Sequence, residues 1–183
     1  MAGRIHFNPK PEKIVETLLY LATKGEFTRY QIVKFFYLAD REHLRRYGRP
    51  VTFDKYVAMK NGPVASIAYD LLKQQDVCGI KCQDLPFDLV EKGAHWGIAN
   101  PKRDVRTELF SKTDLKVLDS IVEEFAGCSF DELWEHTHRH EAYDKVWSNR
   151  STNADDMAFD DFFENISNRE TIVDELAFAS RGM

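Results

Sequence analysis

Long apolar runs and cysteine pairs are scarce in this sequence of 183 residues. No stretch approaches the roughly 18 consecutive apolar residues that a membrane-spanning helix needs. Residues 1–11 lack the apolar segment of a secretion signal, so we expect a cytoplasmic protein that does not contact membranes. The three cysteines, Cys78, Cys82 and Cys128, are an odd number, which favours reduced, buried or half-buried thiols over disulfides or a zinc site.

Motifs of catalysis and of cofactor binding are also missing. The sequence contains no GxSxG, no glycine-rich phosphate loop and no GxGxxG. Three histidines stand close together, at positions 136, 138 and 140. On a helix His136 and His140 share one face, His138 lies nearly opposite, and the HExxH signature is absent. We therefore predict no enzyme, no cofactor and no metal site.

The composition is that of a folded domain, with 43% apolar and 30% charged residues. The net charge of −5 conceals an asymmetry. Residues 1–74 carry 13 Lys and Arg against 7 Asp and Glu, whereas residues 75–183 carry 12 against 23. A basic half and an acidic half can dock on each other, or each can face a partner of opposite charge.

Helical periodicity dominates both ends of the sequence. Apolar spacing predicts a helix over 11–24 and a second from Thr28 to about residue 46, where Thr28 and Gln31 have the spacing of a capping box. This second helix is apolar on most sides, which is typical of a central helix. Further helices are expected over 64–75, over 111–127, and from Ser129, paired with Glu132, to about residue 147.

The middle of the sequence favours β-structure. Residues 51–59 resemble a short strand or extended arm, and Asn61-Gly62-Pro63 is a strong breaker. Short β-like runs are expected at 77–81, 87–90, 94–99 and 106–110. We predict an α+β, mainly helical fold, in which a compact helical domain carries a small antiparallel sheet or hairpins inserted around residues 77–110. Residues 1–152 would form the domain, and residues 153–183 an acidic-aromatic extension packed on it.

Two stretches are candidate binding sites. Arg41, Arg45, Arg46 and Arg49, with Tyr37 and Tyr47 nearby, form either a phosphate-contacting patch or an ordinary charged helix end. The extension combines eight acids over residues 155–175 with Phe159, Phe162 and Phe163. These phenylalanines either pack on the protein's own core or bind a partner with a basic surface.

Several motifs occur in the order found in a known family. Residues 34–40 (KFFYLAD) resemble the central helix of the SocA-like antitoxin, or Panacea, family. Residues 53–64 are similar to its extended arm, with Ala58, Gly62-Pro63-Val64 and then Tyr69. Leu109-Phe110-Ser111, then Ser129, Glu132-Leu133, Thr137-His138 and Glu141-Ala142-Tyr143, resemble its second half. The resemblance covers about residues 12–147. It departs at Tyr143, where an aromatic residue, often Trp, is usual, and residues 153–183 lie outside the pattern.

The resemblance implies an α+β, non-catalytic protein of bacterial or phage toxin–antitoxin systems. It would bind and neutralise a cognate toxin, and relatives of SocA imply a proteolytic adaptor that delivers the toxin to a protease such as ClpXP. The alternative is a transcriptional regulator that binds nucleic acid through the basic patch at 41–49. We consider nucleic acid the weaker prediction, because the net charge is negative and no helix-turn-helix with a basic recognition helix is evident.

Each group of residues has a predicted role. The predicted partner contacts are Tyr37, Arg41, Arg45, Tyr56, Met59, Phe159, Phe162 and Phe163. The family-motif residues expected to be structural are Lys34, Asp40, Gly62, Pro63, Tyr69, Ser111, Ser129, His138 and Glu141. Lys34 and Asp40 lie near the ends of an apolar helix segment, where a buried charge needs a partner, and Gly62-Pro63 sets a turn.

Overall fold

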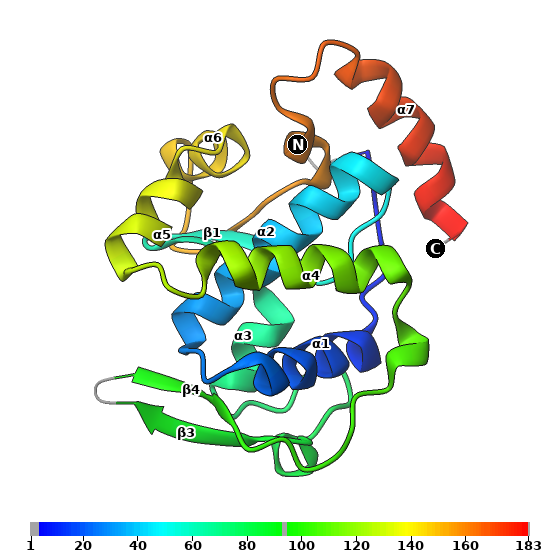
Figure 1. The fold of residues 1–183 in the computed structure, drawn as a ribbon. Helices are drawn as coiled ribbons and strands as arrows, with labels where there is room; N and C mark the ends of the chain where they lie inside the picture. Colours follow the sequence, from blue (N-terminus) through cyan, green and yellow to red (C-terminus); the bar gives the residue numbers. More distant parts are fainter. Residues whose placement is uncertain (1–3, 93–94, 183) are drawn as a thin grey trace.

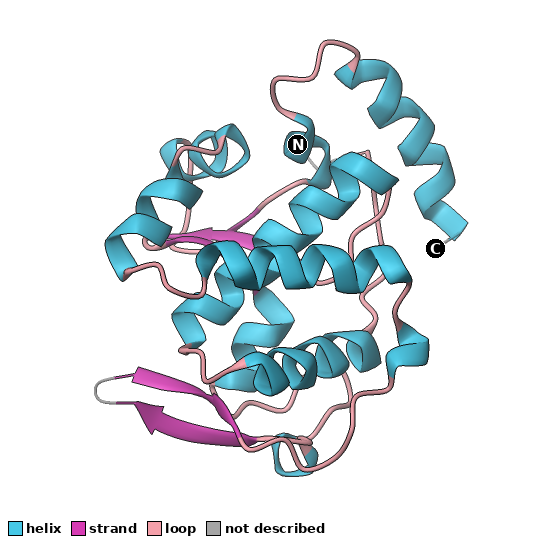
Figure 2. Ribbon diagram, viewed as in Figure 1, coloured by secondary structure: helices cyan, strands magenta, loops and turns pink. Residues whose placement is uncertain are grey.

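The computed structural model describes residues 4–92 and 95–182 (Figure 1). Helices make up most of it, and two small antiparallel sheets lie at separate places (Figure 2), which confirms the predicted α+β, mainly helical class. The helices are α1 (Pro11–Lys24), α2 (Arg29–Tyr47), α3 (Ser66–Leu72), α4 (Lys112–Phe125), α5 (Phe130–His138), α6 (Glu141–Ser148) and α7 (Arg169–Ala179). The strands are β1 (Tyr56–Met59), β2 (Gly62–Ala65), β3 (Asp88–Lys92), β4 (His95–Ala99) and β5 (Asp155–Asp156).

Helix α2 is the centre of the molecule, as its apolar character predicts. It contacts α3, α4, α5 and strands of both sheets, and residues 32–40 are buried without interruption. Figure 1 shows α4 crossing α2, with the β3–β4 hairpin at one end of the molecule, α6 and α7 at the other, and α5 between them. Every element that carries a candidate site is therefore positioned against α2.

Side-chain caps fix three helix starts. Thr28, Ser111 and Ser129 each accept a hydrogen bond from the backbone amide three residues later, and the side chain there bonds back. These capping boxes satisfy amides that a helix leaves unpaired in its first turn. The starts of α2 and α5 confirm the capping boxes predicted from the sequence.

The predicted single helix over 129–147 is wrong, because it is divided into α5 and α6. His140 has an extended backbone (ψ 123°) and precedes α6. Its Nδ1 lies 3.0 Å from the Tyr37 hydroxyl, and the Ala142 amide donates to the Glu164 carboxylate at 2.7 Å. Both partners are distant in sequence, so the local periodicity does not show the break.

Strands β1 and β2 form a hairpin, and β5 adds to its other edge in the order β2-β1-β5. The prediction of a helix starting at residue 64 is wrong at its start, since residues 62–65 form β2 and α3 begins at Ser66. Pro63 is tolerated because β2 is an edge strand and needs no second row of hydrogen bonds. The buried Asp54 carboxylate accepts the Ile67 and Ala68 amides at 2.9 Å each and so caps α3.

The segment 77–110 is only partly strand. The runs at 87–90 and 94–99 correspond to β3 and β4, although Ala94 lies outside the described residues. The run at 77–81 contributes one isolated bridge, and the run at 106–110 is wrong, because residues 107–109 form a 3₁₀ helix. Cys78 is exposed, contrary to expectation, whereas Cys82 and Cys128 are half-buried, and all three thiols are free.

Residues 153–182 pack on the rest of the chain. Strand β5 pairs with Val57 and Ala58 of β1. Phe162, Phe163 and Val173 belong to the same apolar core as α2. Among the described residues, no helix is both long enough and apolar enough to cross a membrane.

Candidate functional site

Lys34 is fully buried beneath the β1–β2 hairpin. Its Nζ donates to the Pro63 carbonyl at 2.7 Å, and burial lowers the pKa of Lys34 to about 7. Gly62 has a φ of +99°, and a Cβ there would lie 2.9 Å from this Nζ. Lys34, Gly62 and Pro63 thus form one packed unit, which supports the prediction that they are structural.

Asp40 is the second buried charge of α2. Its carboxylate accepts hydrogen bonds from the amides of Val51 and Thr52 at 2.8 and 2.7 Å, and from the hydroxyls of Thr52 and Tyr56 at 2.6 and 2.7 Å. Burial raises the pKa of Asp40, and these four donors oppose that shift. Asp40 therefore holds the chain that leads from α2 into the hairpin.

Half of the eight predicted partner contacts lie inside the protein. Tyr37, Tyr56, Phe162 and Phe163 are at most 3% exposed, so the folded chain offers a partner no surface at these positions. Of the two alternatives for the phenylalanines of residues 153–183, packing on the protein's own core is the one that Phe162 and Phe163 follow. Met59 and Phe159 are half-buried.

The basic patch at 41–49 is used within the chain. Arg41 pairs with Glu164, and Arg45 donates to the carbonyls of Phe162 and Glu164. Arg46 pairs with Glu42, one turn earlier on the same helix. Arg49 pairs with the buried Asp114 at 2.8 Å. The patch therefore binds the protein's own acids and carbonyls, and a phosphate there would compete with these partners.

The three clustered histidines, His136, His138 and His140, are half-buried. The rings of His136 and His140 lie 5.4 Å apart, and the His138 ring stacks on Trp134 at 3.8 Å. His138 Nδ1 donates to the Trp134 carbonyl at 2.7 Å, and burial lowers the pKa of His138. The described residues contain no group of three or more His, Cys, Asp or Glu side chains suited to a metal ion.

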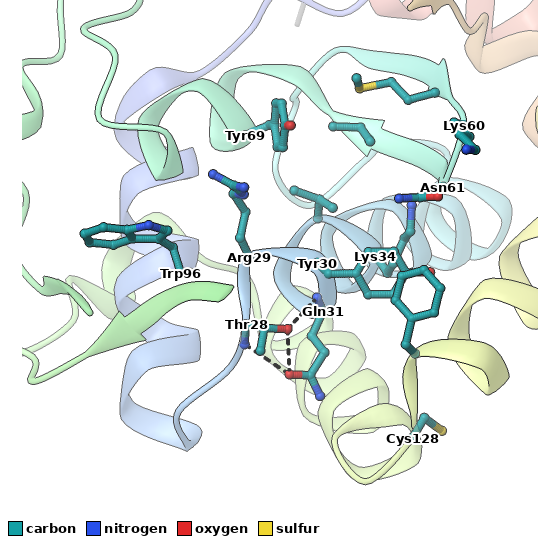
Figure 3. Close-up of a pocket in the computed structure, with 14 residues that line it drawn as sticks. Thr28, Arg29, Tyr30, Gln31, Lys34, Lys60, Asn61, Tyr69, Trp96 and Cys128 are labelled. Carbon is teal, nitrogen blue, oxygen red and sulfur yellow. Dashed lines mark hydrogen bonds between the residues drawn. The ribbon is translucent and has the colours of Figure 1, made fainter. Parts of the chain in front are cut away.

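A pocket of about 470 Å³ lies between the start of α2, the hairpin tip, β4 and the start of α5 (Figure 3). Its lining residues are Thr28, Arg29, Tyr30, Gln31, Val33, Lys34, Met59, Lys60, Asn61, Val64, Tyr69, Trp96, Cys128 and Phe130. Three of them are cationic (Arg29, Lys34 and Lys60), and none is acidic. In Figure 3 Arg29 extends between Trp96 and Tyr69, and its guanidinium carbon lies 5.3 Å from the Tyr69 ring centre.

Exposed aromatic side chains continue from the pocket along α5. The Tyr30 ring packs on Phe130 with centres 4.4 Å apart, and Phe130 is 48% exposed. Trp134, one turn further along the helix, is 38% exposed. The Tyr30 hydroxyl is buried without a hydrogen-bond partner among the described residues. The pocket and these rings form one face, which we call the hairpin-side face.

Residues 32–144, more than half of the chain, match the family described as antitoxin SocA-like, Panacea domain. The chain belongs to this family. Searches of curated proteins and of solved structures gave no match. The matched part of the Panacea domain runs from α2 into α6, and it contains Lys34, Asp40, the hairpin and both exposed aromatics of α5.

Sequence reasoning missed most of the hairpin-side face. Phe130 and Trp134 were available as a signal: they stand one turn apart on a helix whose buried positions are Leu133 and Thr137, so they mark a second apolar face. Among the predicted residues, Lys34, Met59 and Tyr69 line the pocket. Ser111 and Ser129 are helix caps, and Glu141 is exposed at the start of α6.

Buried acids with distant partners were also missed. Asp114 binds Lys13 at 2.7 Å and lies 3.0 Å from His43 Nε2. Burial raises the pKa of Asp114, but His43 and Lys13 together lower it well below its usual range. Glu16 binds Arg103 and Arg106, across 87 and 90 residues of sequence.

Proposed function

We propose that this Panacea-domain protein is an antitoxin that binds a cognate toxin protein directly, in the cytoplasm of a bacterium or during phage infection. The family match supports the antitoxin role in general. The observation that carries direct binding is the hairpin-side face, where Phe130 and Trp134 remain exposed beside a pocket lined by three cationic and no acidic side chains.

The proposed binding divides the work between two kinds of side chain. Aromatic rings that become buried at an interface contribute most of the affinity, and they are often the residues at which alanine substitution weakens a complex most. Cationic side chains at the edge speed the encounter with an oppositely charged partner. Phe130 and Trp134 are the proposed anchors, and Arg29 and Lys60 supply the charge.

Binding to nucleic acid has less support. Its proposed contacts, Arg41, Arg45, Arg46 and Arg49, all pair with acids or carbonyls of the chain itself. A phosphate would have to displace these partners, two of which, Glu164 and Asp114, are buried. We therefore retain toxin binding as the proposed function.

Co-expression tests this function. The chain is expressed together with the small reading frame beside its gene, which should arrest growth when expressed alone. We expect growth to recover and the two proteins to purify as one complex. The double variant Phe130→Ala, Trp134→Ala should lose the complex and stay folded, with a slightly lower melting temperature because each ring also stacks on one neighbour. Phe178→Ala, which removes an 83% exposed ring on α7, is the matched control. The proposal fails if the wild-type chain neither restores growth nor binds its neighbour.

Delivery of the toxin to ClpXP is a finer form of the proposal, and it rests on the family resemblance. Its measurement is the half-life of the toxin with and without the antitoxin, in cells that have or lack ClpX. Neutralisation by masking alone predicts a toxin half-life that ClpX does not change.

A further inference from the structure

We propose that the pocket of the hairpin-side face holds a carboxylate of the toxin, carried on an acidic side chain that neighbours an apolar or aromatic residue. The inference rests on the proposed function and names the chemistry of the segment that binds. It is drawn from three observations: the charge of the pocket, its unfilled donors and its size.

The charge of the lining side chains favours an anion. Arg29, Lys34 and Lys60 line the pocket, and no ion pair joins any of them to a described acid. Asp131 lies close enough to Tyr30 to raise its pKa further, after burial, but it does not line the pocket. A carboxylate that enters would therefore meet Arg29, Lys60 and the Lys34 amine, which its negative charge keeps protonated.

One buried donor in the pocket lacks an acceptor among the described residues, and a second has only one. The Tyr30 hydroxyl has no partner among the described residues, and Lys34 Nζ has the single acceptor Pro63. A buried donor without an acceptor is destabilising, and a protonated lysine amine can donate three hydrogen bonds. One carboxylate offers two oxygens with about four acceptor positions, which suits both donors at once.

The size and the remaining lining suit a peptide side chain with its neighbour. About 470 Å³ lies within the range of small-ligand sites, roughly 300–1,000 Å³. Val33, Val64, Trp96 and Phe130 give the pocket apolar walls, and Phe130 continues them to the open surface. The carboxylate would sit at the cationic end while the adjacent apolar side chain contacts these walls.

Proton uptake follows from this arrangement. Free Lys34 has a pKa of about 7, and a bound carboxylate holds it protonated. Affinity should therefore be highest below pH 7 and fall by up to about tenfold per pH unit above it. The titratable groups around Lys34 are Tyr30, whose ring centre lies 5.0 Å from Nζ, and His138, which interacts with its charge. Lys60 and Cys128 line the same pocket, and Tyr143 bonds to the hairpin above it. Burial lowers the pKa of His138 and raises those of Cys128, Tyr30 and Tyr143, the last to about 12.

A displayed library of short random peptides, selected on the full-length chain, tests the pocket without a known toxin. We expect the selected peptides to carry Asp or Glu beside an apolar or aromatic residue. Peptides without an acid, or no selected peptides at all, would overturn the inference. Selection of peptides while the neighbouring protein fails to bind would instead count against the proposed toxin and leave the pocket chemistry intact.

Substitutions in the chain then test whether the selected peptide binds in the pocket. Tyr30→Phe removes only the hydroxyl and should weaken binding about tenfold, while the melting temperature stays the same or rises. Arg29→Glu reverses a charge at the first position of α2, where an acid favours the helix, and should abolish binding without unfolding the chain. Lys112→Glu, at the first position of α4, is the matched control, and Tyr47→Phe is the control for Tyr30.

Other occupants give different results. If a second copy of the chain fills the pocket, gel filtration should show a dimer that Arg29→Glu dissociates, and this would overturn the assignment to the toxin. Peptides that bind Tyr30→Phe and Arg29→Glu as tightly as the wild-type chain occupy another surface, which would also overturn it.

Discussion

The two halves of α2 differ in how fully their buried polar groups are hydrogen-bonded. In the C-terminal half, Asp40 accepts four hydrogen bonds, and Arg41 and Arg45 are engaged by residues 162–164. In the N-terminal half, Lys34 has a single acceptor and the Tyr30 hydroxyl has none among the described residues. In the C-terminal half Arg41 Nε also lacks a partner among the described residues, but the other groups named above are hydrogen-bonded and build the fold. In the N-terminal half the incompletely bonded groups lie in a pocket that opens to the surface.

Removal of residues 153–183 should lower stability most, because it exposes the C-terminal half of α2. Burial of Phe162, Phe163 and Val173 contributes roughly 4.5–9 kcal/mol at about 1.5–3 kcal/mol per side chain. That is comparable to the whole stability of a domain, about 5–15 kcal/mol. We expect the truncated chain to lose cooperative unfolding in urea.

A shorter truncation after Asn165 is the control. It keeps Phe162, Phe163 and Glu164, removes α7, and should lower the melting temperature by less. A chain ending at Thr152 that melts like the wild type would show that the extension is not part of the core.

Among single substitutions in the C-terminal half of α2, Asp40→Ala should lower the free energy of unfolding most. It leaves the amides of Val51 and Thr52 without their acceptor inside the protein, which we expect to lower the free energy of unfolding by roughly 3–5 kcal/mol. Urea unfolding measures it, and Asp40→Asn, which keeps one acceptor oxygen, should lose less. Full stability combined with loss of toxin binding would contradict the structural role.

The pH dependence of stability isolates Lys34. Burial lowers its pKa from 10.5 to about 7, so between these values the unfolded chain holds a proton that the folded chain lacks. The contribution of Lys34 to stability therefore rises with pH across this window, by up to about 2–3 kcal/mol from pH 7 to 9. The free energy of unfolding of the wild type, relative to Lys34→Met, should show this slope. A constant difference between the two would show that the amine is not desolvated.

Two tyrosines of α2 give the smallest and sharpest contrast. The Tyr37 hydroxyl bonds His140, so Tyr37→Phe should lower the free energy of unfolding by about 1 kcal/mol. The Tyr30 hydroxyl has no partner within residues 4–92 and 95–182, so Tyr30→Phe should leave the free energy of unfolding unchanged or raise it by up to about 1 kcal/mol. Thermal unfolding of both variants measures the difference, and equal losses would mean that Tyr30 has a partner inside the fold.

Local signals in the sequence predicted the elements whose causes are local. The helix over 11–24 and the caps at Thr28 and Ser129 depend on residues within one or two turns, so spacing alone located them. The break before His140 and the strand that includes Pro63 depend on Glu164, Tyr37 and the edge position of β2. Those causes are distant in sequence, and no periodicity contains them.

The residues of the candidate site were likewise predicted only in part. The motif residues Lys34 and Gly62 were predicted, and the structure brings them together with Pro63 beneath the hairpin. Phe162 and Phe163 were ambiguous, because an apolar residue among acids suits a partner surface and a core equally well. In the structure both side chains are buried against α2 and so belong to the core. This burial requires the chain after residue 153 to fold back onto α2, which the composition does not reveal.

The pairing of Arg41 with Glu164 also sets an order of events during synthesis. The two residues are 123 positions apart, so a ribosome needs roughly 6–25 s to supply the acid after the arginine. Throughout that interval the nascent chain displays Tyr37 and Tyr56 without the phenylalanines that later cover them. Incomplete chains are therefore the form of this protein whose core is exposed to chaperones and proteases.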